Sequence, residues 1–355
     1  FSDLLNQRLR ELTQKENPPF VYAGAGFGSD ARGYEAFQAY IGTGNSDSLT
    51  GLKAFQEEME RIIKYGFTQS ELDRTRANML NDIEQAFNER NKTESANYAE
   101  EYIRNFLTQE PIPGIANEAK YYKELLPQIT VEDVNAVAKK LSQNTNEFIA
   151  LTGPQPTAGK TLPTDAEILA VKSEVSKMDI KPYEEKAVAT DLLTKMPVAG
   201  KITVTKKNDV LGTTDFTLSN GVTITFKHTD FKNDQVLMSA IRPGGKNTYG
   251  ISDKYNAEYM ISVISSMGIG EFSPVDLKKA LSGKTVSVNP SFSANSEGFS
   301  GSSSLKDVES MMQLIYLYGT SPRVDTTLFK SFLQKNQAHL AVLSANPQVL
   351  FIVSL

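Results

Sequence analysis

The chain has 355 residues, of which 40% are hydrophobic and 22% are charged, and its formal net charge is −5. This composition is typical of a soluble globular protein, and the length has room for two domains. The acidic balance argues against nucleic acid as the main partner, because phosphate binding needs a basic surface. The absence of cysteine excludes disulfide bonds and thiol catalysis. No apolar run approaches the roughly 18 residues that a membrane span requires.

Residues 1–154 are expected to form one α+β unit. An amphipathic helix over 4–12 opens it, and Leu72, Met79, Ile83 and Phe87 recur later at helical spacing, which predicts one buried face. The other expected elements are strands over 20–27 and 36–41, a helix capped by Asp47 or Ser48 that ends at Gly66, a helix opened by a Thr68–Glu71 capping box, helices capped by Thr93 and Thr130, and a closing strand over 147–151.

Residues 155–212 differ in character and are expected to link two domains. Prolines punctuate this stretch, and one amphipathic helix, Asp165 to Val175, interrupts the extended chain. Such a segment usually joins domains rather than forming one.

Residues 213–355 are expected to form a second α+β unit. A hairpin over 216–224 turns at Asn220-Gly221, a strong short-range signal. Because strands cluster first and helices follow, the sheets should be mostly antiparallel with helices packed on one face. The other expected elements are a strand over 236–241, a helix from Ser252 to Met267, a short helix over 277–281, strands over 286–288, 291–293 and up to 301, and helices over 305–318 and 328–343.

The stretch Tyr255-Asn256-Ala257-Glu258-Tyr259 reads like the inverted zinc motif H-x-x-E-H with both histidines replaced by tyrosine. A phenol has an ordinary pKa of about 10, so it stays protonated at neutral pH and is a poor zinc ligand. The chain has only two histidines, His228 and His339, so a three-ligand site would need at least one carboxylate from elsewhere. We therefore expect no metal site and no catalytic residue in this chain.

For these residues, ordinary packing or solvent exposure is favoured over a role as metal ligands. Tyr255 and Tyr259 are four positions apart on a helix and are expected to pack as a half-buried aromatic pair. Glu258 is expected to be a solvated helix residue, His228 an exposed loop histidine, and His339 a packed residue among alanine and leucine.

Several segments together resemble the pitrilysin and insulysin family of zinc metallopeptidases. Their order and spacing carry the resemblance, which covers nearly the whole chain. The segments are LNQRLREL over 5–12, FVY over 20–22, GFTQSEL over 66–72, ITVEDV over 129–134 and LSNGV over 218–222.

The resemblance implies a protein built from two-domain repeats that face each other as a clamshell around a peptide chamber. Zinc would be held in one half-repeat, where the motif glutamate acts as general base on the metal-bound water. On this basis the chain is the second domain of repeat one plus the degenerate first domain of repeat two. Zinc is then expected only in a catalytic domain that lies upstream.

Four residues are candidates for facing substrate. Arg10 and Tyr22 resemble a family pair from the pattern L-R-x-x-x-x-L-x-Y, although they are twelve positions apart, and they would face the degenerate site. Val286 and Val288 lie in the segment Lys284 to Ser293, which matches the region that holds peptide as an added strand in catalytic domains.

Two functions follow from the resemblance. In the first, the chain is a non-catalytic portion of a zinc metalloendopeptidase that lines the peptide chamber and supports the catalytic half. In the second, it belongs to a wholly inactive homologue that acts as a structural or peptide-binding scaffold. The expected partners are a peptide or unfolded protein substrate and the missing catalytic half of the same chain, with no nucleic acid and no membrane span.

The sequence also leads to expectations about its two ends and about the compartment of the protein. The chain opens directly into a helix, without a signal peptide, and ends on an apolar run over 349–355, so we expect a piece of a longer protein whose second unit is truncated. Bacterial relatives of this shape are often exported, which predicts a periplasmic or exported protein.

Overall fold

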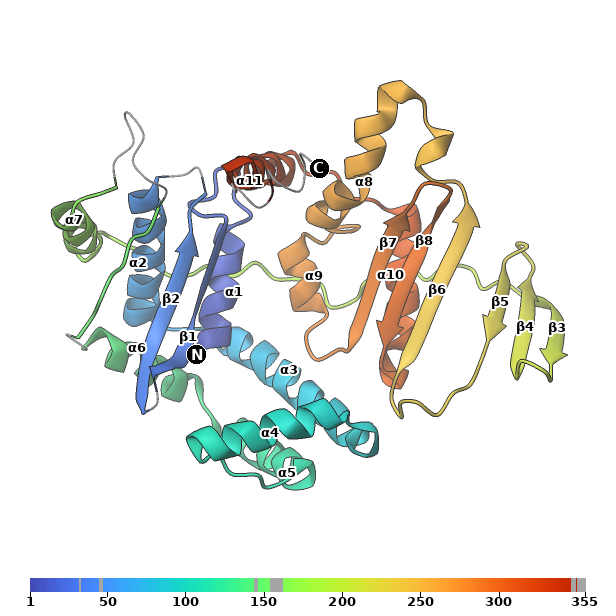
Figure 1. The fold of residues 1–355 in the computed structure, drawn as a ribbon, viewed down its shortest axis with the longest axis horizontal. Helices are drawn as coiled ribbons and strands as arrows, with labels where there is room; N and C mark the ends of the chain where they lie inside the picture. Colours follow the sequence, from blue (N-terminus) through green and yellow to red (C-terminus); the bar gives the residue numbers. More distant parts are fainter. Residues whose placement is uncertain (32, 45–46, 144–145, 154–161, 346–348, 350–355) are drawn as a thin grey trace.

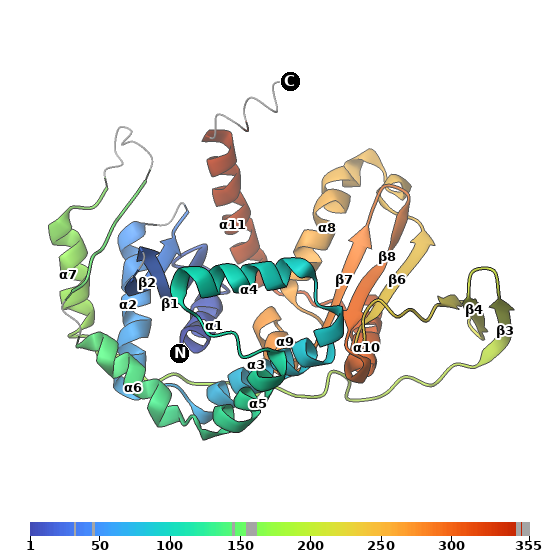
Figure 2. The same cartoon turned by 60° about the horizontal axis from the view of Figure 1, so that its bottom comes forward.

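The computed structural model describes residues 1–31, 33–44, 47–143, 146–153, 162–345 and 349. Within these residues the strands form three antiparallel sheets, with orders β1-β2, β3-β4-β5 and β6-β8-β7, and helices lie between and around them (Figure 1). The expected α+β class with mostly antiparallel sheets is confirmed. Figure 2 shows the same arrangement from below, with α4 in front of the first unit.

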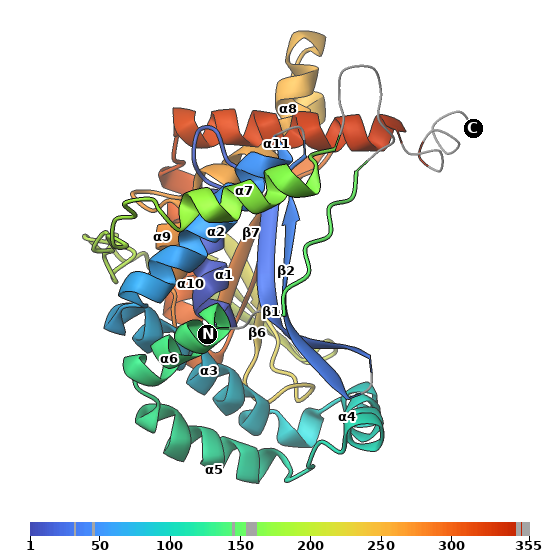
Figure 3. The same cartoon turned by 90° about the vertical axis from the view of Figure 1, so that its left-hand side faces the viewer.

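The first unit places one helix layer against a two-stranded sheet. Its elements are α1 (Ser2–Leu12), β1 (Tyr22–Ala31), β2 (Tyr34–Gly42), α2 (Ser48–Tyr65), α3 (Gln69–Asn88), α4 (Ser95–Thr108), α5 (Ile115–Leu125) and α6 (Val131–Ser142). In Figure 3, α1 and α2 lie on one side of β1 and β2, and the other side of this sheet carries no helix layer. We call this second side the open side.

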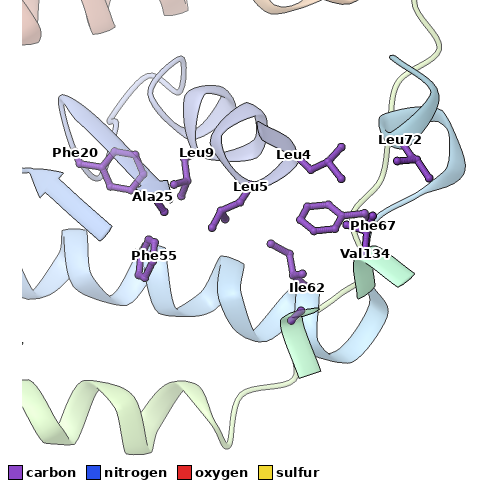
Figure 4. Packing of buried hydrophobic residues seen from close by; sticks show 11 residues of the cluster. Leu4, Leu5, Leu9, Phe20, Ala25, Phe55, Ile62, Phe67, Leu72 and Val134 are labelled. Carbon is purple, nitrogen blue, oxygen red and sulfur yellow. The ribbon is translucent and has the colours of Figure 1, made fainter. Parts of the chain in front are cut away.

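The core of the first unit forms where α1 meets α2 and the hairpin. Leu5 and Leu9 are fully buried on α1 and pack with Phe20, Phe55 and Ile62 (Figure 4). The two apolar faces therefore remove each other from water, which is the main stabilising term for such a helix pair.

The helix ends follow the capping chemistry that the sequence predicts. The Asp47 carboxylate accepts a hydrogen bond from the Thr50 N–H at the start of α2. Gly66 ends that helix with φ of 75°, a left-handed conformation that glycine adopts without strain. Thr68 and Glu71 then form the expected capping box of α3.

A buried ion cluster centred on Arg8 ties α1 to α2 and α3. The Arg8 guanidinium donates to both oxygens of Glu71 at 2.7 and 2.8 Å and to Glu58 at 3.2 Å. It also donates to the Gly66 carbonyl at 3.0 Å. The side chains of Arg8, Glu58 and Glu71 are at most 3% exposed. A charge cluster this dry is held only because nearly every polar group in it has a partner.

The described part of the segment over 155–212 packs partly on the first unit and partly on the second. Helix α7 (Asp165–Val175) packs on α2, where Val171, Val175 and Ile180 form a small buried cluster with Leu49 and Leu52. Further along, Leu192 is buried in the core of the second unit, with Val188 and Leu193 packed around it. The chain therefore crosses from one unit to the other between these two anchors.

The second unit combines a helix-backed sheet with a separate small sheet. Its elements are β3 (Ile202–Asn208), β4 (Thr213–Leu218), β5 (Thr223–Phe226), β6 (Val236–Pro243), α8 (Lys254–Met267), α9 (Pro274–Ala280), β7 (Val286–Phe292), β8 (Ser296–Ser303), α10 (Val308–Thr320) and α11 (Thr326–Ala345). Met311 and Leu314 of α10 pack with Val288 and Ile269 in its core. The expected hairpin turns at Gly221, whose φ is 87°.

The two units meet along a polar surface of α3. Asn81 donates to the Thr285 hydroxyl at 2.7 Å, and the Asn78 side chain accepts from the Gly283 N–H at 2.7 Å. Asn88 donates to the Asp234 carboxylate at 3.0 Å. This interface is held by hydrogen bonds between amides, hydroxyls and carboxylates rather than by apolar burial.

Several predictions about single elements are wrong. The strand over 147–151 is absent from the described residues, where Phe148 is 88% exposed and no neighbouring backbone pairs with it. The helices expected from Thr93 and Ser252 instead begin after Glu94 and Asp253, without a side-chain cap. The sequence analysis also missed α5 and β3, and the two short strands after Thr285 form the single strand β7.

Replacement of Arg8 tests the buried ion cluster. Arg8→Ala should lower the free energy of unfolding by about 3–5 kcal/mol, because Glu71 then loses its buried partner. Arg10→Ala, on the exposed side of the same helix, should change it by less than about 0.5 kcal/mol. Urea unfolding of the three proteins measures both values, and equal losses in the two variants would contradict the assigned role of Arg8.

The same cluster predicts a loss of stability in acid. Burial by itself raises the pKa of Glu71, but the hydrogen bonds and charge of Arg8 and the hydrogen bonds of Thr68 outweigh it and lower the pKa below its ordinary value. The unfolded chain then binds the proton more readily, so this stabilisation is present above the ordinary glutamate pKa of about 4.3 and is lost as the pH falls below it. Urea unfolding from pH 7 to pH 3 should show a steeper decline for the parent chain than for Glu71→Gln, and parallel curves would contradict the assignment.

Candidate functional site

The positions of the zinc-like motif lie at the start of α8, on the molecular surface. A turn over Ile251–Asp253 leads into the helix. Tyr255 is 73% exposed and Tyr259 is also exposed, so the prediction of a half-buried aromatic pair is wrong. The Glu258 carboxylate is exposed, as expected, and accepts a hydrogen bond from the Lys246 ammonium at 2.8 Å.

These residues do not fit a zinc ion. Two phenols offer poor ligands, and the carboxylate of Glu258 already forms an ion pair with Lys246. His228 is exposed in the segment after β5, as expected, whereas His339 is exposed on α11 and does not pack as predicted. In the part of the chain that the structure describes, no three histidine, aspartate or glutamate side chains are grouped in a way that would hold a metal.

The strand β7 lies at an edge of its sheet, since among the described strands it pairs with β8 alone. The side chain of Val288 is buried against Met311, and Val286 is partly buried in the same core. A peptide added along this edge would therefore be held by the strand backbone rather than by these two side chains. Pro290 fits an edge position because it has no N–H to donate.

Arg10 and Tyr22 lie on different elements of the first unit. Arg10 is exposed in the last turn of α1. The pKa of Lys278 in the second unit is lowered, first by burial of the lysine and then by the positive charge of Arg10. The Tyr22 ring covers Gly42 of the neighbouring strand, where a Cβ atom would lie 2.2 Å from the ring. No hydrogen bond or ring contact joins Arg10 to Tyr22 in the described ranges. Substrate contact by either residue stays a prediction.

A charged cluster around Tyr183 was not predicted by the sequence analysis. The Tyr183 hydroxyl donates to both oxygens of Glu11 at 2.9 Å, and the Lys279 ammonium lies 2.6 Å from Glu11. The guanidinium of Arg8 stacks over the Tyr183 ring at 4.2 Å from its centre. Burial, followed by the charge of Glu11, raises the pKa of Tyr183, so this phenol stays protonated as a hydrogen-bond donor. The partners are far apart in sequence, so no local pattern could have revealed them.

A cavity of about 510 Å³ lies between α3 and the second unit. Asn81, Gln85 and Asn88 line one wall, and Asp234 and Thr285 line the other. These groups hydrogen-bond to one another across the interface. They do not assemble a nucleophile with a base, so the cavity has the character of an interface rather than of an active site.

Three known proteins are similar to this chain in sequence. The chain is 29% identical to a zinc protease PQQL-like protein of Arabidopsis thaliana over 77% of its length and 26% of that protein. It is 25% identical to the probable zinc protease PqqL of Haemophilus influenzae over 99% of its length and 38% of the relative. It is 20% identical to the probable zinc protease PqqL of Escherichia coli over 97% and 37% of the two chains. The chain matches no family model.

Two solved structures are also similar. The periplasmic protease PqqL from Escherichia coli aligns with 98% of this chain and 38% of its own, at 20% identity and a TM-score of 0.45. The ferredoxin protease FusC, in complex with Arabidopsis ferredoxin, aligns with 95% of this chain and 39% of its own, at 16% identity and a TM-score of 0.48. The chain thus spans about a quarter to two fifths of the length of the proteins that it matches.

The chain is therefore a relative of zinc proteases, and it corresponds to a portion of them rather than to their whole length. Through the PqqL proteases, the resemblance to the pitrilysin and insulysin type of zinc metallopeptidases is confirmed. No helix in the described residues is both long enough and apolar enough to cross a membrane.

Replacement of Glu258 tests whether the degenerate motif keeps any chemistry. In a preparation of the longer protein that cleaves peptide, Glu258→Gln should change kcat by less than about twofold, because the carboxylate forms only an exposed ion pair with Lys246. Loss of a general base typically costs at least about a hundredfold, so a fall of that size would contradict our reading. The matched control is Glu309→Gln, an acidic residue in the first turn of α10.

Proposed function

We propose that this chain is a non-catalytic portion of a zinc metalloendopeptidase, lining the peptide chamber and supporting a catalytic half located upstream. The observation that carries the proposal is the start of α8. There, Tyr255, Glu258 and Tyr259 occupy the positions of a zinc motif and offer no usable ligand set. The similarity to zinc proteases along nearly the whole chain supports the same assignment.

The open side of the sheets supports the lining role. Strand register places Tyr22, Gly24 and Tyr40 on the face of β1-β2 that is turned away from the core residue Ala25. In the larger sheet, Ser300 and Ser302 alternate with residues that face α10, and they share the outer face with the exposed side chains of Leu237 and Ile241. Figure 3 shows α1, α2 and α10 together on the other side of the strands. An uncovered sheet face with both polar and apolar side chains, together with an edge strand at β7, suits an extended polypeptide.

Several further assignments belong to the proposal. Zinc would be supplied by the catalytic domain upstream, and the substrate would be a peptide or an unfolded protein. The domain boundaries 1–154, 155–212 and 213–355 stay a prediction, although β3 inside the middle segment pairs with β4 of the second unit. A periplasmic or exported location in a bacterium stays a prediction.

Zinc content and peptide cleavage, measured on two proteins, test the function. The 355-residue chain should contain no stoichiometric zinc by elemental analysis and should not cleave a casein-derived peptide. The longer natural protein should contain about one zinc per chain and should cleave that peptide in a chelator-sensitive way.

Each other result excludes part of the proposal. Stoichiometric zinc with chelator-sensitive cleavage in the 355-residue chain would overturn the non-catalytic assignment. An inactive, zinc-free longer protein that still binds the peptide would favour the scaffold function instead.

A further inference from the structure

Helix α4 exposes an apolar face that the rest of the described structure leaves uncovered. None of its residues is buried. With about 3.6 residues per turn, its large apolar side chains gather on one half of the helix surface. We call this set the α4 face; it consists of Tyr98, Tyr102, Ile103, Phe106 and Leu107, which are between 42% and 76% exposed.

The exposure of this face has a physical cost. A single exposed apolar residue is ordinary, but five on adjacent turns form a contiguous patch of the kind that marks an interaction site. Three of the five side chains are aromatic or carry a phenol, and such rings bind both apolar groups and cations. The helix is therefore built to contact something other than water.

The charges around the α4 face limit what that partner is. Glu94, Glu100 and Glu101 lie on or beside the helix, and none of them forms an ion pair within the described ranges. Arg104, the basic residue of the helix, is already neutralised by Glu110 at 3.2 Å. The apolar face is thus bordered by free carboxylates, which attract a basic partner and repel an acidic one.

The helix that carries the α4 face also lies on the side where the proposed function places substrate. Figure 3 places α4 on the open side of β1 and β2, away from α1 and α2. Figures 1 and 3 both place it at the end of the molecule where the turn between β1 and β2 lies. Tyr34 and Tyr40, on the outer face of that hairpin, are also exposed.

We propose that the α4 face is a docking surface for polypeptide segments that are both apolar and basic. The proposal rests on the proposed function, since it names the class of substrate segment that the chamber would hold. Aromatic and aliphatic side chains of the segment would pack on Phe106 and Tyr102, while its lysines and arginines would approach Glu100 and Glu101. A second copy of this chain and an acidic protein are the competing occupants.

Fluorescence anisotropy on the 355-residue chain tests this docking. The probes are a labelled peptide of alternating lysine and leucine pairs and a matched peptide with glutamate in place of lysine. The basic peptide should bind at least about tenfold more tightly than the acidic one at low salt, and this preference should shrink at high salt. Glu100→Gln combined with Glu101→Gln should reduce the preference without unfolding the helix.

Variants of the apolar residues distinguish docking on the α4 face from non-specific hydrophobic binding. Phe106→Ser should weaken binding of the basic peptide by about tenfold or more, as expected for the loss of one packed aromatic ring. The control is Phe231→Ser, which removes a phenylalanine of similar exposure, 79%, from a segment outside α4. Circular dichroism checks that both variants keep the helix content of the parent chain.

Three results would overturn the proposal. They are equal binding of the two peptides, equal losses in Phe106→Ser and Phe231→Ser, and a parent chain that sediments as a dimer which Phe106→Ser converts to monomer without peptide binding. Because the assay needs neither zinc nor cleavage, its failure leaves the zinc and cleavage results of the proposed function unaffected. Cleavage by the chain alone would overturn the proposed function without deciding the docking.

Discussion

The buried guanidinium of Arg8 is the interaction on which the rest of the structure depends. It reaches Glu71 at the start of α3, Glu58 on α2 and the carbonyl of Gly66 between them, so one side chain fixes three helices. Burial alone would lower the pKa of Arg8, but Glu71 and Glu58 raise it, so the charge is kept inside the protein. Removing either partner would leave an uncompensated charge in a dry site, which is the costly case.

The same side chain connects the first unit to the second. Arg8 stacks on the ring of Tyr183, whose hydroxyl is held by Glu11, and Glu11 in turn pairs with Lys279 of α9. Arg74 of α3 pairs with Glu185 on the same stretch of linker at 2.5 Å. The linker is thus clamped by charges at the point where it crosses between the two cores. A polar clamp suits this position because the surfaces on either side of it are themselves polar.

The proposed non-catalytic role and the surfaces that the chain presents are consistent with one another. Its zinc-like motif lies on an exposed helix and is occupied by phenols and an ion-paired carboxylate. The chain also presents an edge strand at β7 and an exposed apolar helix surface on α4. Such features suit the proposed binding and positioning of a polypeptide.

The sequence by itself determined the class of the fold and most helix ends, and it predicts the loss of the zinc ligands. Local signals act within a few residues, so the local sequence predicts their effect. Examples are the cap of Thr68 with Glu71, the glycine at 66 with positive φ and the Asn220-Gly221 turn. Tertiary structure decided the rest. The strand expected over 147–151 did not form, because a strand needs a neighbouring backbone that no local pattern supplies. Likewise, the partnership of Arg8, Tyr183 and Lys279 and the exposure of the α4 face depend on which distant segments pack together, and that is fixed only when the chain has folded.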